Sequence, residues 1–452
     1  MKNIIYRAGT LILMALSLAG FASSAPTVTL LYSFGFDASK GKGHVSDLIV
    51  GQHGALYGTT YDGGANGYGT IFKLTPPASP GAAWKETVLY SFCSQPECFD
   101  GSYPIGSLVA YQGALFGTTT YGGNTCGYSG CGTIFKLSPP ASAGDPWTYA
   151  VIYYFQPAGS RAVVDGTNPM AGLTVDPQGV LYGTTNGGGG YGYGTVFRLP
   201  PDTGHGWNET VLHTFGGSND GTYPQSGVTL GAEGALYGTT SEGGSNGYGT
   251  VFQLTPPGVG HTSWPEAVLH SFTGGNDGAY PIARLAVGTD GGLYGTTSYG
   301  GAGASCDASS SCGTVFKMVP PDKLIPRWTL STLHSFPYNY PDGQYPRAGV
   351  TFGKDGALYG TTEYGGKSPG GPGSGKERCG FLYRCGTIFK LTGSGVDWTE
   401  TVIYKFCAGE FCTTGAYPTA GLVAYQGALY GTTSYQGSGA ACNCGTVFRL
   451  DY

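Results

Sequence analysis

Three acidic residues follow a phrase that recurs along the chain, and they are the candidates for catalysis. Asp62, Glu242 and Glu363 each lie one or two residues beyond a Gly-Thr-Thr triplet. Paired carboxylates cleave glycosidic bonds, one acting as the acid and the other as the base or nucleophile. These three come from different repeats and have no supporting histidine. Solvated loop charge is the simpler interpretation, so they are weak candidates for a polysaccharide hydrolase or lyase.

Tyrosines in the same glycine-rich stretches favour binding. They include Tyr61, Tyr121, Tyr299, Tyr364 and Tyr435. Aromatic faces beside hydrogen-bonding loops suit carbohydrate or peptide ligands. Packing at a strand end is the favoured explanation for any single tyrosine. We therefore predict binding for the group rather than for one residue.

Other residues argue against a metal enzyme. His213, His270 and His334 occupy one equivalent position in three repeats, and the chain contains no Gly-x-Ser-x-Gly, P-loop or His-Glu-x-x-His motif. A recurring Asp-Gly-x-Tyr-Pro sequence, as at Asp220 and Asp277, offers one carboxylate per loop, which is thin for calcium. A turn followed by a packed tyrosine is the favoured interpretation. We expect no metal and no cofactor.

The twelve cysteines form six close pairs in sequence. The pairs are Cys93 with Cys98, Cys126 with Cys131, Cys306 with Cys312, Cys379 with Cys385, Cys407 with Cys412, and Cys442 with Cys444. An even number with local spacing favours disulfides in an exported protein. Zinc is the alternative, but no pair has a second pair beside it or a histidine in ligand spacing. The ring closed by Cys442 and Cys444 would be strained, so their mutual pairing stays open.

The elements that position these residues repeat seven times. A Leu-aromatic-Gly-Thr-Thr phrase begins at Leu56, Leu115, Leu181, Leu236, Leu293, Leu358 and Leu429, with a mean spacing of about 62 residues. Each copy is followed by Gly-Thr-(Ile/Val)-Phe, in which apolar and polar residues alternate as in a strand. A short apolar run precedes the Leu-aromatic-Gly-Thr-Thr phrase, and another strand-like segment follows the Gly-Thr-(Ile/Val)-Phe phrase. We therefore predict four strands in each repeat.

The fourth strand gives the sharpest signal. All six tryptophans open it, and each precedes a phenylalanine by eight residues, as Trp84 precedes Phe92. A further copy without a tryptophan, Thr27 to Phe34, precedes the first repeat, whereas the last repeat lacks its fourth strand. Pairing these two ends would close a ring and remove unpaired strand edges. The sequence therefore predicts an all-β, seven-bladed propeller with four strands per blade, in which the N-terminal strand completes the last blade.

Composition and the N-terminus indicate an exported protein. Lys2 and Arg7 precede an apolar run, Leu11 to Phe21, and small residues that suit cleavage, which together resemble a secretory signal peptide over residues 1–25. We expect one propeller domain over residues 26–452, secreted or periplasmic, and monomeric. The apolar run is short for a membrane span. A net charge of −5 offers no basic footprint for nucleic acid.

The phrases Leu-Tyr-Gly-Thr-Thr-x-x-Gly-Gly and Gly-Tyr-Gly-Thr-(Ile/Val)-Phe-x-Leu resemble the tandem repeat named for Gloeobacter and Verrucomicrobia. The resemblance covers nearly the whole chain after the signal segment. It implies an extracellular repeat protein and brings no established activity or catalytic residues. The chain lacks a recognisable C-terminal sorting anchor of the kind found in many members.

Loop placement then favours one face for function. All six cysteine pairs, and the insertions 301–311 and 367–384, fall in the connections between blades or between the second and third strands. In a propeller these connections emerge on one face, where recognition loops commonly lie. We expect a binding module for a glycan, a peptide or an extracellular surface partner. The alternatives are the hydrolase or lyase named above and a structural envelope protein.

Overall fold

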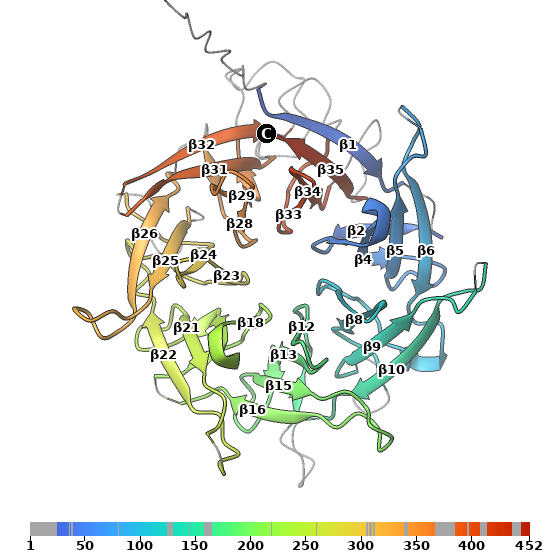
Figure 1. The fold of residues 1–452 in the computed structure, drawn as a ribbon, viewed down its shortest axis with the longest axis horizontal. Helices are drawn as coiled ribbons and strands as arrows, with labels where there is room; N and C mark the ends of the chain where they lie inside the picture. Colours follow the sequence, from blue (N-terminus) through green and yellow to red (C-terminus); the bar gives the residue numbers. More distant parts are fainter. Residues whose placement is uncertain are drawn as a thin grey trace, which may run out of the picture.

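The protein is a ring of seven β-blades (Figure 1). The computed structural model describes residues 25–452 except 36, 38, 80, 124–129, 143, 158–164, 218, 259, 304–305, 307–309, 311, 339–341, 367–384, 396, 407–413 and 436–443. The predicted propeller is confirmed, and the predicted signal segment lies outside these residues up to residue 24. Within the described part, no helix has the length and apolar character to cross a membrane.

Each blade is a four-stranded antiparallel sheet whose strands run in order from the axis to the rim. Blade 1 contains β3 (Ile49–Val50), β4 (Leu56–Gly63), β5 (Thr70–Thr75) and β6 (Lys85–Ser91). Blade 2 contains β7 (Val109–Tyr111), β8 (Ala114–Thr119), β9 (Thr133–Ser138) and β10 (Thr148–Tyr154). Blade 3 contains β12 (Thr174–Val175), β13 (Leu181–Thr185), β15 (Thr195–Leu199) and β16 (Thr210–Thr214). Blades 4 to 6 are β18 (Thr229–Leu230), β19 (Leu236–Thr240), β21 (Thr250–Leu254) and β22 (Glu266–Ser271); β23 (Ala286–Val287), β24 (Leu293–Thr297), β25 (Thr314–Val319) and β26 (Thr329–Ser335); β28 (Thr351–Phe352), β29 (Leu358–Thr362), β31 (Thr387–Ser394) and β32 (Asp397–Lys405).

Blade 7 closes the ring with strands from both ends of the chain. It contains β33 (Val423–Tyr425), β34 (Ala428–Thr433), β35 (Thr446–Asp451) and, at the rim, β1 (Thr27–Ser33). β1 pairs antiparallel with β35 from Thr27 opposite Asp451 to Ser33 opposite Thr446, with one register shift. The N-terminal strand therefore occupies the position predicted for it.

Short additional pairings lie at one end of the blades. β2 (Gly41–Val45) pairs with the far end of β4. Three two-stranded ribbons repeat this arrangement: β11 (Gly166–Thr167) with β14 (Gly187–Gly188), β17 (Gly221–Thr222) with β20 (Glu242–Gly243), and β27 (Gly343–Gln344) with β30 (Tyr364–Gly365). They join the connection entering a blade to the loop after its second strand. The 3₁₀ turns are η1 (Gln52–Gly54), η2 (Pro96–Cys98) and η4 (Ala232–Gly234).

The first threonine of each Gly-Thr-Thr joins its blade to the next. Its buried hydroxyl donates to a backbone carbonyl at the start of the next blade's innermost segment, over 2.8 to 3.3 Å. The seven pairs are Thr59 with Gly106, Thr118 with Ala171, Thr184 with Ser226, Thr239 with Ala283, Thr296 with Ala348, Thr361 with Ala420, and Thr432 with Val45. The last pair completes the circle, because it links blade 7 to blade 1.

The rest of the phrase packs within the blade. The second threonine shares a hydrogen bond with the threonine that opens the third strand, as Thr297 does with Thr314 at 2.9 Å. A Cβ on the glycine would meet the phenylalanine ring of the third strand; at Gly295 it would lie 2.5 Å from Phe316 Cζ. Glycine is therefore required so that this ring can lie flat against the second strand.

Aromatic rings fill the junctions between blades. The buried phenylalanine that ends each outer strand contacts the third-strand phenylalanine of the next blade, with ring centroids 5.2 to 5.4 Å apart at all seven junctions. Five tryptophans contact an aromatic ring on the preceding blade's second strand, as Trp147 packs on Tyr57; they are Trp147, Trp207, Trp264, Trp328 and Trp398. β1 lacks a tryptophan, and Tyr452 takes that place, 4.5 Å from the Tyr359 ring.

Replacing Gly295 with alanine should therefore destabilise the fold. We expect a loss of about 1–3 kcal/mol, the usual cost of overpacking a core, because the methyl group and the Phe316 ring cannot both fit. Gly258→Ala is the matched control, since its Cβ would meet only His261 at 3.8 Å. Denaturant midpoints of both variants test this. Equal midpoints for Gly295→Ala and the wild type would contradict the packing argument.

A half-buried acid at the junction of blades 2 and 3 makes stability depend on pH. The Tyr153 hydroxyl donates to Asp165 at 2.9 Å, whereas Glu209 Oε1 is buried without a hydrogen-bond partner among the described residues. Burial, with a smaller contribution from the charge of Asp165, raises the pKa of Glu209 to about 8. The folded protein therefore keeps a proton that the unfolded chain releases above its ordinary pKa of 4.5.

Stability should consequently fall as the pH rises from about 4.5 to about 8, the interval between the two pKa values. Glu209→Gln mimics the protonated acid and should be more stable than the wild type at pH 8.5 by roughly 1–3 kcal/mol, with little difference at pH 4.5. Unfolding curves across this range measure the effect. The exposed Glu233→Gln variant should follow the wild type. Parallel curves for Glu209→Gln and the wild type would refute the assignment.

Candidate functional site

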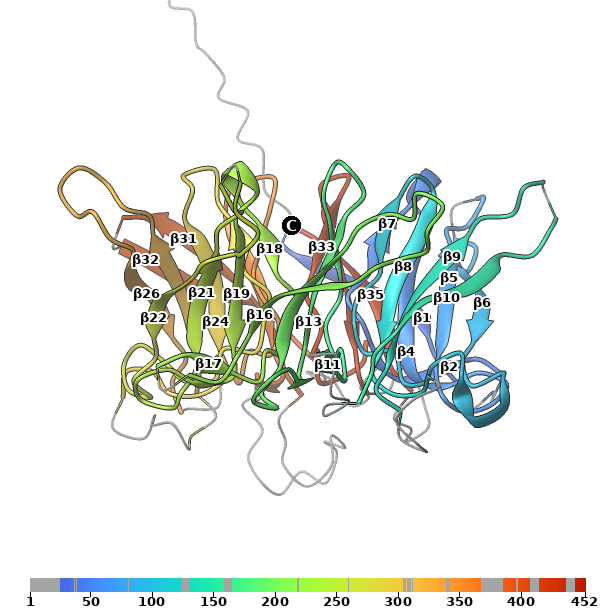
Figure 2. The ribbon, with the colours of Figure 1, turned by 90° about the horizontal axis from the view of Figure 1, so that it is seen from below.

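The two faces of the ring differ in their connections. In Figure 2 the short pairings that include β2, β11 and β17 lie along the lower face, which we call the loop face. It carries the connections between blades and those between the second and third strands. The opposite turn face carries the tight turn between the first and second strands, including η4, and the hairpins between the third and fourth strands. This is the division that the repeat order predicted.

Disulfides lie on the loop face. Cys93 bonds to Cys98, and Cys306 bonds to Cys312, as predicted. Cys131, Cys385 and Cys444 are also disulfide-bonded. Their expected partners Cys126, Cys379 and Cys442, and the predicted pair Cys407 and Cys412, lie outside the described residues.

One position explains why cysteines alternate with tyrosines in these loops. The residue before each Gly-Thr of the third strand is Tyr68, Cys131, Tyr193, Tyr248, Cys312, Cys385 or Cys444. In the first six copies its carbonyl accepts the backbone N–H of the residue before the conserved proline in the next blade, over 2.8 to 3.0 Å. A tyrosine there also packs its ring on the next blade, as Tyr248 packs on Tyr280. A disulfide replaces that ring contact where the residue is cysteine.

The predicted binding tyrosines lie in two groups of contacting aromatic rings. Rings contact in the order Tyr248, Tyr280, Tyr299, Tyr345, Tyr364, Tyr417 and Tyr435, with centroids 5.0 to 6.0 Å apart. A second group joins Tyr103 to Tyr61, Tyr68 and Tyr121. Four of the five predicted residues are half-buried in these contacts, whereas Tyr121 is 36% exposed. These ring contacts cross blade junctions, so they also hold neighbouring connections of the loop face together.

The exposed aromatic side chains gather on the same face. Among the described residues they are Tyr68, Phe99, Tyr121, Tyr191, Tyr193 and Tyr338, all in connections of the loop face. Tyr191 is 67% exposed, yet it lies close to Gly216. A Cβ added to Gly216 would stand 2.5 Å from the Tyr191 Cβ. The remaining exposed large apolar residues are Val287, Leu324 and Ile325 on the turn-face side. Sequence reasoning missed Phe99 and Tyr338, because exposure has no local sequence signal.

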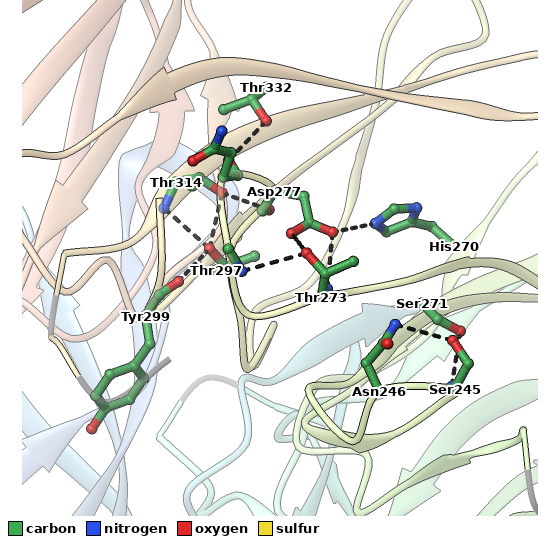
Figure 3. A network of polar contacts seen from close by, with 12 residues as sticks. Ser245, Asn246, His270, Ser271, Thr273, Asp277, Thr297, Tyr299, Thr314 and Thr332 are labelled. Atoms are coloured by element: carbon green, nitrogen blue, oxygen red, sulfur yellow. Dashed lines mark hydrogen bonds and ion pairs between the residues drawn. The ribbon is translucent and has the colours of Figure 1, made fainter. Parts of the chain in front are cut away.

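The recurring aspartates serve their own loops. Asp100 is fully buried and accepts hydrogen bonds from the Tyr90 hydroxyl and from Ser94. Asp277 accepts in the same way from His270 and Thr273, as Figure 3 shows. These bonds fix the outer strand to the connection that follows it. The turn interpretation therefore describes these residues better than calcium binding.

The three candidate carboxylates lie in blades 1, 4 and 6. Glu363 lies 3.5 Å from the Arg347 guanidinium, which partly offsets the rise in its carboxyl pKa caused by burial. Burial also raises the pKa of Asp62, and Lys42 opposes the rise. Glu242 is exposed. No hydrogen bond or ion pair of the described residues joins two of the three.

A small polar cavity of about 180 Å³ lies on the axis. Residues of all seven blades line it, at the entry to each innermost strand. Arg284 donates through Nη2 to Val228 O at 3.0 Å and to Thr174 Oγ1, so this blade 5 residue reaches blades 3 and 4. Asp47 accepts from the backbone N–H of Gly421 at 2.6 Å. A volume of this size admits a few waters, each occupying about 30 Å³, or one small polar group.

Burial sets the charge of the axial cavity. It lowers the pKa of His44 to about 4, with a smaller contribution from Arg347, so the imidazole is neutral and shares a 2.7 Å hydrogen bond with Thr419. Burial lowers the pKa of Arg284, while the nearby carboxylate of Asp47, which is itself exposed, opposes that shift. The sequence did not single out this site, because its residues differ between repeats.

Comparison with solved structures finds glucose dehydrogenases at low similarity. A putative oxidoreductase (glucose dehydrogenase) of Thermus thermophilus is 15% identical, with a TM-score of 0.43 over 94% of this chain and 99% of that chain. A second glucose dehydrogenase is 13% identical, with a TM-score of 0.40 over 94% of this chain and 98% of that chain. We draw nothing about activity from either. None of the curated proteins matches the chain.

The family comparison is more specific. The model of the Gloeobacter/Verrucomicrobia repeat matches residues 13–191 and 169–373, which together cover most of the chain. The matched stretches contain six of the seven Gly-Thr-Thr phrases whose hydroxyls link one blade to the next. The chain therefore belongs to the Gloeobacter/Verrucomicrobia repeat family.

Proposed function

We propose that this propeller is an extracellular binding module that holds a neutral glycan on its loop face. The observation that carries the proposal is that the exposed aromatic side chains of the described residues lie in connections of that face, beside glycine-rich loops that present backbone hydrogen-bonding groups. Sugar rings offer apolar faces that stack on aromatic side chains and hydroxyls that bond to such groups. Only 11% of the residues are charged, which favours a neutral ligand over an ionic one.

The loop face is also stiff enough to act as a platform. In the described part of the loop face, disulfides and ring contacts link neighbouring connections, so a ligand would order few of those side chains on binding. Pre-organisation of this kind lowers the entropic cost of association. The half-buried residues Tyr61, Tyr299, Tyr364 and Tyr435 support the platform in this proposal, and Tyr68, Tyr121 and Tyr191 contact the glycan.

Export belongs to the same proposal. Residues 1–25 would act as a signal peptide and residues 26–452 would form the mature propeller. Disulfide bonds and the family are both typical of extracellular proteins. A glycan ligand would be a component of the cell surface or of the surrounding matrix.

Glycan arrays probed with the purified, oxidised protein test the proposal. We expect binding to one class of neutral glycan, and a weaker affinity for Tyr68→Ala, Tyr121→Ala and Tyr191→Ala. Each loss should be about 3- to 10-fold, since one aromatic contact contributes about 0.5–1.5 kcal/mol. Calorimetry with the strongest array ligand measures this.

Ile325→Ala, which alters an exposed residue of the turn-face side, is the control and should bind as the wild type does. A peptide array run in parallel distinguishes a protein ligand. Binding to peptides alone, or equal losses for Ile325→Ala and the tyrosine variants, would overturn the glycan proposal.

A further inference from the structure

Each junction between blades has three corresponding residue positions near the rim. The first position lies two residues before the phenylalanine that ends the outer strand. The second lies in the connection to the next blade. The third lies on the outer strand of that next blade, two residues after the tryptophan position. In order the sets are Tyr32, Lys40 and Glu86; Tyr90, Asp100 and Tyr149; Tyr153, Asp165 and Glu209; His213, Asp220 and Glu266; His270, Asp277 and Leu330; His334, Asp342 and Glu400; and Tyr404, Thr414 and Val28.

Two of the seven junctions combine a histidine with two carboxylates. His213 Nε2 lies 3.1 Å from Asp220 Oδ2, and the potential ligand atoms of His213, Asp220 and Glu266 all lie within 4.8 Å of one another. The same holds for His334, Asp342 and Glu400, where the His334 Nε2 to Asp342 Oδ2 distance is 3.7 Å. Neighbouring ligands of a tetrahedral ion with bonds of 2.0–2.1 Å stand about 3.3 Å apart.

Polar atoms at these two junctions have no hydrogen-bond partner. Glu266 Oε1, His334 Nε2 and Glu400 Oε1 are buried and unpartnered among the described residues. A buried polar atom without a partner destabilises the folded state. Both clusters therefore contain atoms that a bound ion would satisfy.

The junction between blades 4 and 5 shows what the same position looks like with its bonds satisfied. His270 Nε2 shares a 3.0 Å contact with Asp277, and the Thr273 hydroxyl takes the other carboxylate oxygen (Figure 3). Leu330 replaces the glutamate, so there is one negative charge and no third ligand. The two clusters differ from this junction by a second acid.

Charge balance supports a cation at both clusters. Where Glu86 occupies the third position, Lys40 lies 3.3 Å away and neutralises it. Glu266 and Glu400 each have a second carboxylate nearby and no lysine or arginine ion pair among the described residues, although Lys405 is near enough to Glu400 to lower its carboxyl pKa. Two carboxylates and a neutral imidazole together balance one divalent ion.

We propose that the His213–Asp220–Glu266 and His334–Asp342–Glu400 clusters each bind one divalent transition-metal ion of the zinc class. One imidazole nitrogen with two carboxylate oxygens suits a borderline ion such as Zn²⁺, and water would complete the shell. Calcium prefers six to eight oxygen ligands, which three side chains do not supply. Because the ligands come from adjacent blades, the ion would fasten blade 3 to blade 4 and blade 5 to blade 6. This departs from the expectation that histidines far apart argue against metal, since each histidine finds its own carboxylates.

Metal titration of the tag-free, oxidised protein tests the proposal, after chelator treatment and dialysis. With zinc chloride as the probe, we expect two equivalents bound and a higher melting temperature, with no such response to calcium chloride. Glu266→Leu and Glu400→Leu reproduce the residue that blade 5 already accepts at this position, so they should fold. Each should bind one equivalent, and the double variant should bind none and lose the zinc-dependent rise in melting temperature.

His270→Ala is the matched control, because it removes a histidine of the same register from a junction without the second acid. It should retain two equivalents. The proposal is overturned if the wild-type protein binds no zinc, if the Glu266→Leu and Glu400→Leu double variant still binds two equivalents, or if His270→Ala loses one. If no zinc binds, a proton shared within each cluster would instead explain the acid oxygens that have no hydrogen-bond partner.

Discussion

The hydroxyl of one threonine per repeat governs how the blades meet. It reaches across each junction to a backbone carbonyl beside the axis, and the seventh such bond returns to blade 1. The bond is buried, so a blade that lost its neighbour would leave both a donor and an acceptor unsatisfied. The glycine before the threonine lets the third-strand phenylalanine approach, and that ring meets the phenylalanine of the preceding blade. The Gly-Thr-Thr phrase therefore couples the packing inside one blade to the position of the next.

Most of the fold could be predicted because it depends on residues that recur. The period, the Trp-to-Phe spacing and the displaced first strand together indicated seven blades and the way in which they close. The face that carries the disulfides followed from the same order. Tyr452 was missed as the partner of Tyr359, because a single aromatic residue after the last strand has no repeat to compare it with.

The candidate sites were less predictable because they depend on differences between repeats. Tyr299 and Tyr364 could be named from the sequence, yet both are half-buried against Tyr345 of a neighbouring connection, Tyr299 edge to face and Tyr364 stacked. The axial cavity depends on Arg284 and Asp47, which occur once each at varied positions. At the rim, His213 and Glu266 are separated by a full repeat, and only the closing of one blade on the next brings them together. Spacing within a motif cannot reveal a site that is divided between two repeats.

Closure by β1 and β35 has a consequence for how the molecule is made. β1 leaves the ribosome before any blade exists, and its partner β35 emerges after the other six blades are complete. The edge of β1 that pairs with β35 therefore stays unpaired until nearly the whole chain has been synthesised. A chain interrupted before residue 446 would expose that edge and an open blade at once. A closed ring therefore distinguishes a chain that contains β35 from one that ends before it.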